Sequence, residues 1–146
     1  HMIVNLNMDA EDCENHNIAL QKKYDIIEAD EQSWEEYCMD DAEYAFVSYG
    51  TSSRIVKSSV DTLRAAGYKV GLIRPKTLYP FPVKAFQRDT IKKYLDVEMS
   101  MGQMADDVKL ACNDKNKVVF YGRTGGIILT PEEVVEFGKS VMGGDK

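Results

Sequence analysis

Short apolar runs alternate with helix-forming segments between residues 42 and 141, with a new strand at intervals of roughly 25 residues. Parallel strands need long crossover connections, which are usually helical, so this alternation predicts a mostly parallel sheet covered by helices on both faces. The expected strands are residues 42–49, 68–73, 95–99 and 117–121, with a minimal fifth strand at 127–129. The expected helices are residues 51–66, 83–94, 103–112 and 131–141. The predicted fold class is therefore α/β, a three-layer, doubly wound α/β/α domain.

An acidic segment precedes this pattern. Residues 1–43 carry a net charge of −11, whereas the remainder of the chain carries +5. Residues 16–38 lack Gly and Pro, and their apolar residues recur at helical spacing, which predicts an amphipathic helix. The apolar face of that helix would contain Leu20, Tyr24, Ile27, Trp34 and Cys38. The helix either packs on the domain or forms an arm that leads to a preceding domain, and the sequence leaves both roles open.

The chain divides into four expected parts. His1-Met2 is typical of the remnant of a cleaved affinity tag, so the natural chain ends are undefined. Residues 3–41 form the acidic extension with its helix, residues 42–141 form the α/β domain, and residues 142–146 form a Gly-rich tail. The sequence Thr130-Pro131-Glu132-Glu133 is a capping box that predicts the start of the last helix.

Composition excludes several classes of protein. With 44% hydrophobic and 29% charged residues, the 146-residue chain fits one globular domain. No apolar run approaches the roughly 20 residues of a membrane-spanning helix, and no signal peptide opens the chain, so we expect a soluble, cytoplasmic protein. No basic run or aromatic-basic stripe favours nucleic acid. Cys13, Cys38 and Cys112 are widely separated in the sequence, and His16 is the one histidine outside the expected tag remnant. This composition argues against a metal site, an iron-sulfur cluster or a disulfide in this chain.

Ligands of doubly wound sheets bind beyond the carboxyl ends of the strands, so the loops after each strand are the candidate sites. The turn after the first strand presents backbone amides and hydroxyls at a helix N-terminus, which suits a phosphate or a carboxylate. The other loops supply two arginines, a carboxylate and an amide. The candidate residues for binding an anion or another ligand are Gly50, Thr51, Ser52, Ser53, Arg74, Glu98, Gln103 and Arg123.

The segment RPKTLYPFP after the second strand combines an arginine, aromatic residues and prolines, a composition typical of protein interfaces. The interface candidates are Tyr79, Phe81, Pro82 and Trp34. The sequence has no H-E-x-x-H or G-x-S-x-G motif and no histidine partner for a nucleophile. It therefore predicts no catalytic residue, and the chain has the features of a non-catalytic module.

Four motifs in order, VSYGTSSRIVKSS, YKVGLIRPKTLYPFP, VEMSMGQM and VFYGRTGGIILTPEE, resemble the 2-oxoacid:ferredoxin oxidoreductases. The chain is most similar to the alpha-subunit domain that follows the pyrimidine-binding domain, whose fold is like the C-terminal domain of transketolase. The match includes the G-T-S turn at residues 50–52, L-I-R-P at 72–75, P-F-P at 80–82, and Glu98, Met99, Gly102 and Gln103 of the E-M-N-x-G-Q segment. Ser100 replaces the usual asparagine, and Lys76 and Tyr79 replace isoleucine and tryptophan.

The resemblance implies an enzyme of anaerobic metabolism that decarboxylates a 2-oxoacid on thiamine diphosphate with Mg²⁺, reduces ferredoxin through iron-sulfur clusters and forms an acyl-coenzyme A. The resemblance is to the 2-oxoisovalerate and pyruvate types of this family, and it favours a branched-chain 2-oxoacid as the substrate. The chain lacks the G-D-G motif and cluster cysteines, so these cofactors would be bound by other domains or by beta, gamma and delta subunits. It would then serve assembly, be inactive alone and self-associate as a fragment. The alternatives are an anion- or coenzyme A-binding domain, and the C-terminal domain of a transketolase or pyruvate dehydrogenase.

Overall fold

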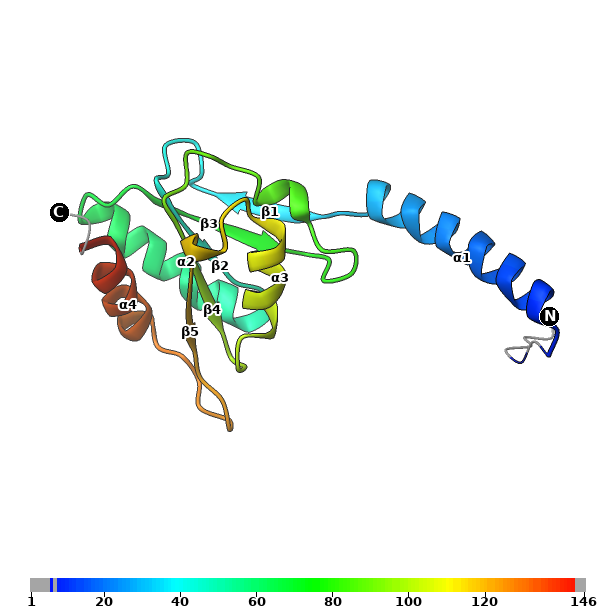
Figure 1. The fold of residues 1–146 in the computed structure, drawn as a ribbon. Coiled ribbons are helices and arrows are strands. Elements are labelled where there is room, and N and C mark those ends of the chain that lie inside the picture. Colours follow the sequence, from blue (N-terminus) through cyan, green and yellow to red (C-terminus); the bar gives the residue numbers. More distant parts are fainter. Residues whose placement is uncertain (1–5, 7, 144–146) are drawn as a thin grey trace.

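The computed structural model describes residue 6 and residues 8–143. Its centre is a five-stranded sheet with the strand order β1-β3-β2-β4-β5 (Figure 1). Strands β2, β3, β4 and β5 are parallel, and the edge strand β1 is antiparallel to β3. The strand bounds are β1 Trp34–Tyr37, β2 Tyr44–Val47, β3 Val70–Pro75, β4 Lys93–Glu98 and β5 Val118–Gly122. The predicted mostly parallel α/β/α class is confirmed.

Helices cover both faces of the sheet because the strands are apolar on both sides. On one face, Phe46, Leu72 and Leu95 belong to the same core cluster as Leu63 and Val134 of the two covering helices. Those helices are α2 (Gly50–Ala65) and α4 (Pro131–Gly143), and α3 (Gln103–Ala111) covers the other face. The central strand β2 is buried along its whole length, as expected for a strand enclosed between two helical layers.

The N-terminal helix differs from its prediction. Helix α1 spans Ala10–Asp30 and extends away from the sheet (Figure 1). The prediction of a helix continuing to Cys38 is wrong, because Trp34–Tyr37 forms strand β1 and Cys38 has a φ of 54°. Ladder hydrogen bonds to β3 outweigh the helical propensity of this stretch. The sheet therefore includes a strand from the segment that we assigned to the acidic extension.

Two further elements were predicted wrongly. Residues 83–94 form only a short 3₁₀ turn at Val83–Ala85 before β4 begins at Lys93. The side chains of Phe86 and Ile91 are buried in the core although the segment between the 3₁₀ turn and β4 is not helical. An irregular segment thus buries the apolar residues that we expected on one face of a helix. Residues 127–129 form no strand, and they follow two glycines with positive φ that keep the chain in a loop. The fifth strand of the sheet is β1 instead.

The capping box at the start of α4 forms as predicted. The backbone N–H of Glu133 donates to Thr130 Oγ1 at 3.3 Å, and the backbone N–H of Thr130 donates to Glu133 Oε2 at 3.0 Å. The helix continues to Gly143. Residues 144–146 of the predicted tail and the predicted tag remnant His1-Met2 lie outside the described residues.

Candidate functional site

The predicted ligand-binding residues all lie at one edge of the sheet. Because β2 to β5 are parallel, the loops that follow them emerge at the same side, which we call the carboxyl edge. In the spatial order of the strands, this edge carries Arg74 at the end of β3, the turn at Gly50 after β2, Glu98 at the end of β4 and Arg123 after β5. The topology thus brings together residues that are up to 73 positions apart in the chain.

The turn between β2 and α2 uses one of its own hydroxyl groups, that of Ser53, in an internal hydrogen bond. Gly50 has a φ of 58°, a conformation that favours glycine, and α2 begins at this residue. The Ser53 hydroxyl donates to the Gly50 carbonyl oxygen at 2.7 Å. Ser52 and Ser53 are buried, and Thr51 is exposed. Of the three hydroxyls predicted here, Thr51 is the one accessible to a ligand.

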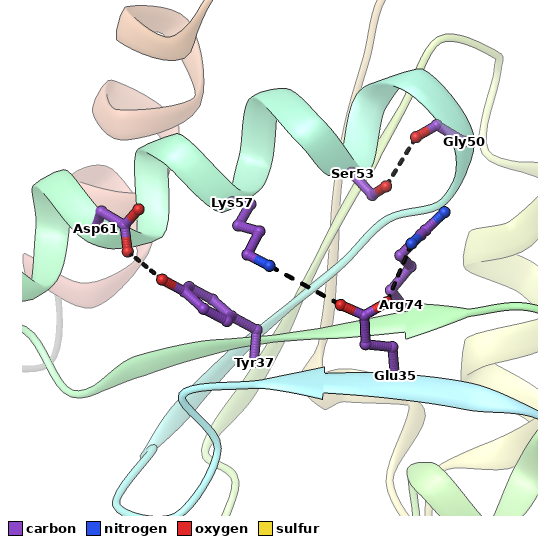
Figure 2. A network of polar contacts seen from close by, with 7 residues as sticks. All are labelled: Glu35, Tyr37, Gly50, Ser53, Lys57, Asp61 and Arg74. Carbon is purple, nitrogen blue, oxygen red and sulfur yellow. Dashed lines mark hydrogen bonds and ion pairs between the residues drawn. The ribbon is translucent and has the colours of Figure 1, made fainter.

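Arg74 is already paired with a carboxylate. Its Nη1 lies 3.0 Å from Glu35 Oε2 on β1, and Lys57 Nζ of α2 lies 3.9 Å from the other oxygen of Glu35 (Figure 2). The same row of contacts includes Tyr37, whose hydroxyl donates to Asp61 at 2.7 Å. That hydrogen bond raises the pKa of Tyr37 to about 12. An anion at Arg74 would therefore have to compete with Glu35 for the guanidinium group.

Glu98 is buried and forms the hydrogen-bonding centre of the turn between β4 and α3. It accepts from the Ser100 hydroxyl at 2.5 Å, the Met104 amide at 3.3 Å and the Ala105 amide at 3.0 Å. Burial by itself would raise the pKa of Glu98, but the neighbouring Asp96 and these three donors outweigh it and lower the pKa below its usual value. Glu98 therefore holds the first turn of α3 as an ionised carboxylate.

Asp96 is the site residue that the sequence reasoning missed. It lies two residues before Glu98 on β4, so both side chains point to the same face of the sheet. Asp96 is fully buried, and neither carboxyl oxygen has a hydrogen-bond partner among the residues that the structure describes. Burial, and then the Glu98 carboxylate, raise its pKa to about 9. The sequence signal that could have revealed Asp96 is the alternation of Tyr94, Asp96 and Glu98, which places all three side chains on one face of the strand. Asp96 is therefore an acidic neighbour of Glu98 that the sequence analysis did not identify.

Arg123 and Gln103 contribute mainly to local structure. Arg123 forms an ion pair with Glu133 of the capping box, and its backbone N–H donates to the Glu98 carbonyl oxygen at 3.1 Å. These contacts fix the base of the loop after β5 against the end of β4. Gln103 accepts from the Met101 amide at 3.1 Å through its side-chain oxygen. Both roles as ligand-binding residues stay predictions.

The four interface candidates differ in accessibility. Tyr79 is 66% exposed, and its ring meets that of Tyr24 of α1 edge to face at 6.4 Å between centroids. Phe81 stacks on Phe86 at 5.3 Å and packs against the core, as does Trp34, while Pro82 is buried. Tyr79 is thus the candidate that offers the largest exposed side chain to a partner.

The described residues were compared with the requirements of a metal-ligand cluster and of a membrane-spanning helix. No three His, Cys, Asp or Glu side chains within this part of the chain come together as ligands for a metal ion. None of the described helices is long and apolar enough to cross a membrane.

The sequence of residues 42–134 matches the family described as pyruvate:ferredoxin oxidoreductase core domain II. The chain belongs to this family. The whole chain is 40% identical over 147 aligned residues to the ketoisovalerate oxidoreductase subunit VorB of Methanothermobacter thermautotrophicus. That alignment covers 98% of this chain and 41% of the relative. The chain is also 40% identical over 94 residues to the 2-oxoglutarate synthase subunit KorA of Methanocaldococcus jannaschii, which covers 64% of this chain and 26% of the relative.

A solved structure supports the same assignment. The chain superposes with a TM-score of 0.76 and 25% identity on a chain of the 2-oxoglutarate:ferredoxin oxidoreductase from Magnetococcus marinus, whose structure was determined with 2-oxoglutarate, coenzyme A and succinyl-CoA bound. The match covers 92% of this chain and 24% of the larger chain. The present chain thus spans about two fifths of the length of the VorB relatives and a smaller share of the other two proteins.

Proposed function

We propose that this chain is the assembly domain of an alpha-type subunit in a 2-oxoacid:ferredoxin oxidoreductase that acts on branched-chain 2-oxoacids. The observation that carries the proposal is the extent of the similarity to VorB, a ketoisovalerate oxidoreductase subunit. It covers 98% of the chain and so includes segments on both sides of residues 42–134. The match to the 2-oxoglutarate synthase subunit from Methanocaldococcus jannaschii covers only 64% of the chain.

In this proposal the chemistry belongs to other parts of a cytoplasmic complex. The whole enzyme would use thiamine diphosphate, Mg²⁺ and iron-sulfur clusters, with coenzyme A as co-substrate and ferredoxin as acceptor, distributed over further domains and beta, gamma and delta subunits. The described residues do not fit a resident metal or cluster, since their acidic, histidine and cysteine side chains form no ligand set. We therefore derive no catalytic step through these groups in this chain, and we expect the isolated chain to be inactive.

The test is an activity assay on the complete complex, purified anaerobically through the full-length subunit that contains this chain. We expect it to reduce a viologen dye when both coenzyme A and a 2-oxoacid are present, with the highest kcat/KM for 2-oxoisovalerate. The same preparation without coenzyme A is the control. A folded, cofactor-loaded complex that is silent with every 2-oxoacid would overturn the proposal, and a preference for pyruvate or 2-oxoglutarate would overturn its substrate class.

A coenzyme A or anion site in this chain is the alternative function. The presence of coenzyme A in the Magnetococcus marinus complex favours it, and Thr51 with Arg74 and Arg123 would be the binding residues. The pairing of both arginines with glutamates weighs against it. A thermal shift assay with coenzyme A decides between the assembly role and the binding role. A ligand at about 100 times its dissociation constant stabilises a protein by about 2.7 kcal/mol. A shift that disappears in Arg74→Ala would support the alternative.

A further inference from the structure

Exposed apolar side chains gather in the loops of the carboxyl edge. Each of the four parallel strands is followed by at least one: Tyr49 after β2, Leu78 and Tyr79 after β3, Met99 and Met101 after β4, and Ile127 and Ile128 after β5. We call these seven residues the apolar rim. Elsewhere in residues 42–143, a stretch that the structure describes completely, only Leu110 and Phe120 are large, apolar and exposed.

The residues of the apolar rim are well exposed and lie on one side of the domain. Met101, Ile127 and Ile128 are 71%, 55% and 67% exposed. Scattered apolar residues on a surface are normal, whereas a concentration on one side marks an interaction site. Two arginines of the same edge are paired with carboxylates of the domain itself, Arg74 with Glu35 and Arg123 with Glu133. The carboxyl edge thus presents apolar side chains outward, while its two arginines are paired within the domain.

Helix α1 extends the same surface. Strand β1 is antiparallel to β3, so it begins at the carboxyl edge, where Trp34 is opposite Pro75 and the Lys76 amide donates to the Ser33 carbonyl oxygen at 2.9 Å. The helix that precedes β1 therefore leaves the domain from this edge (Figure 1). None of its 21 residues, all of them described, is buried. In proteins most of the stability of a helix comes from the packing of one of its faces against other parts of the structure, so α1 needs a partner that packs along it.

We infer that the apolar rim and α1 together form the surface that docks onto another part of the same oxidoreductase. This inference rests on the proposed function, in which the chain is one domain of a larger enzyme. The relatives supply the reason for choosing this occupant, because 59% of VorB and 76% of the Magnetococcus marinus chain lie outside the matched region. Since α1 carries six acidic residues and two lysines, the surface that receives it should be basic.

Site-specific photo-cross-linking in the assembled complex tests the location of this surface. The full-length subunit that contains this chain would carry p-benzoylphenylalanine at Tyr79 or Ile127, two exposed rim positions. Leu110 is the matched control, because it is 85% exposed and apolar but lies near the end of α3, away from the carboxyl edge. We expect cross-links from both rim positions to other domains or subunits of the enzyme and none from Leu110.

A pair of variants provides the second measurement. In Ile127→Asp/Ile128→Asp, two charges enter the docked surface, and we expect the cross-linking yield from Tyr79 to fall about tenfold or more. Leu110→Asp should leave that yield unchanged. Because all three side chains are more than half exposed in the domain, the circular dichroism spectrum should be the same in both variants.

The outcomes separate this inference from the proposed function. Rim cross-links that join two copies of this domain, rim positions that give no cross-links, or cross-linking mainly from Leu110 would each overturn the docking surface, whatever the activity of the complex. An unchanged Tyr79 yield in the double aspartate variant would do the same. Conversely, a complex without 2-oxoacid activity that still gives rim cross-links to its other domains would overturn the proposed function and retain the docking surface.

Discussion

The buried carboxyl of Asp96 makes the stability of the domain depend on pH. Its pKa is raised to about 9 in the folded chain, whereas an unfolded aspartate has a pKa of about 3.9. Between these two values the folded state holds a proton that the unfolded state has released. The free energy of unfolding should therefore fall by about 1.4 kcal/mol for each pH unit, which amounts to about 3 kcal/mol between pH 6 and pH 8.

The sign and the pH window follow from both carboxyl groups of the pair. Because the folded pKa of Asp96 is raised, its destabilising effect is absent below the unfolded pKa and grows until the pH reaches the folded pKa. The pKa of Glu98 is lowered, so the stability that Glu98 contributes is lost only as the pH falls below about 4.3, the pKa of an unfolded glutamate. The range from pH 6 to pH 8 consequently isolates the contribution of Asp96.

Asp96→Asn is the decisive variant. It keeps the shape of the side chain, removes the titrating proton and supplies an amide that can donate to Glu98. We expect the free energy of unfolding in urea of this variant, relative to that of the wild type, to be higher at pH 8 than at pH 6 by about 3 kcal/mol. The control is Asp106→Asn on the exposed surface of α3, which should retain the pH dependence of the wild type.

Two results would refute this reasoning. A wild-type stability that stays constant between pH 6 and pH 8 would mean that Asp96 holds no proton in the folded chain. A slope that persists in Asp96→Asn and disappears in Glu98→Gln would place the proton on Glu98. We assign it to Asp96 because Glu98 accepts three hydrogen bonds and Asp96 accepts none from the described residues.

The remaining predictions concern the fold. Thr130→Ala removes the acceptor for the Glu133 amide and should lower the free energy of unfolding in urea by about 1 kcal/mol. Gly71→Ala would place a Cβ 2.5 Å from Met39 Sδ and 2.7 Å from a backbone oxygen, so we expect a loss of about 1–3 kcal/mol, and a variant as stable as the wild type would contradict this packing. Leu63→Ala, at a fully buried position, should cost about 2–5 kcal/mol, and an equal loss in the exposed variant Leu110→Ala would argue against the core as described.

Local sequence patterns predicted most of the regular structure. The apolar runs that became β2 and β3 are distinct because strands buried on both faces must be apolar at almost every position. The capping box at Thr130 was predictable because its hydrogen bonds join residues three positions apart. Segments 34–38 and 83–94 were predicted wrongly, since their local composition favours a helix while partners distant in the chain determine their conformation.

The candidate site also has features that the sequence determined and features that depend on the tertiary structure. The sequence alone determined which loops follow the parallel strands, and with them the residues that meet at the carboxyl edge. Only the tertiary structure decided how those residues are used. Burial turned Asp96 and Glu98 into a pair of unlike carboxyl groups, glutamates from other segments neutralised Arg74 and Arg123, and the apolar loop residues remained outside. The physical reason is that burial and electrostatic pairing depend on which groups approach each other in space, and no local pattern in the chain encodes those distances.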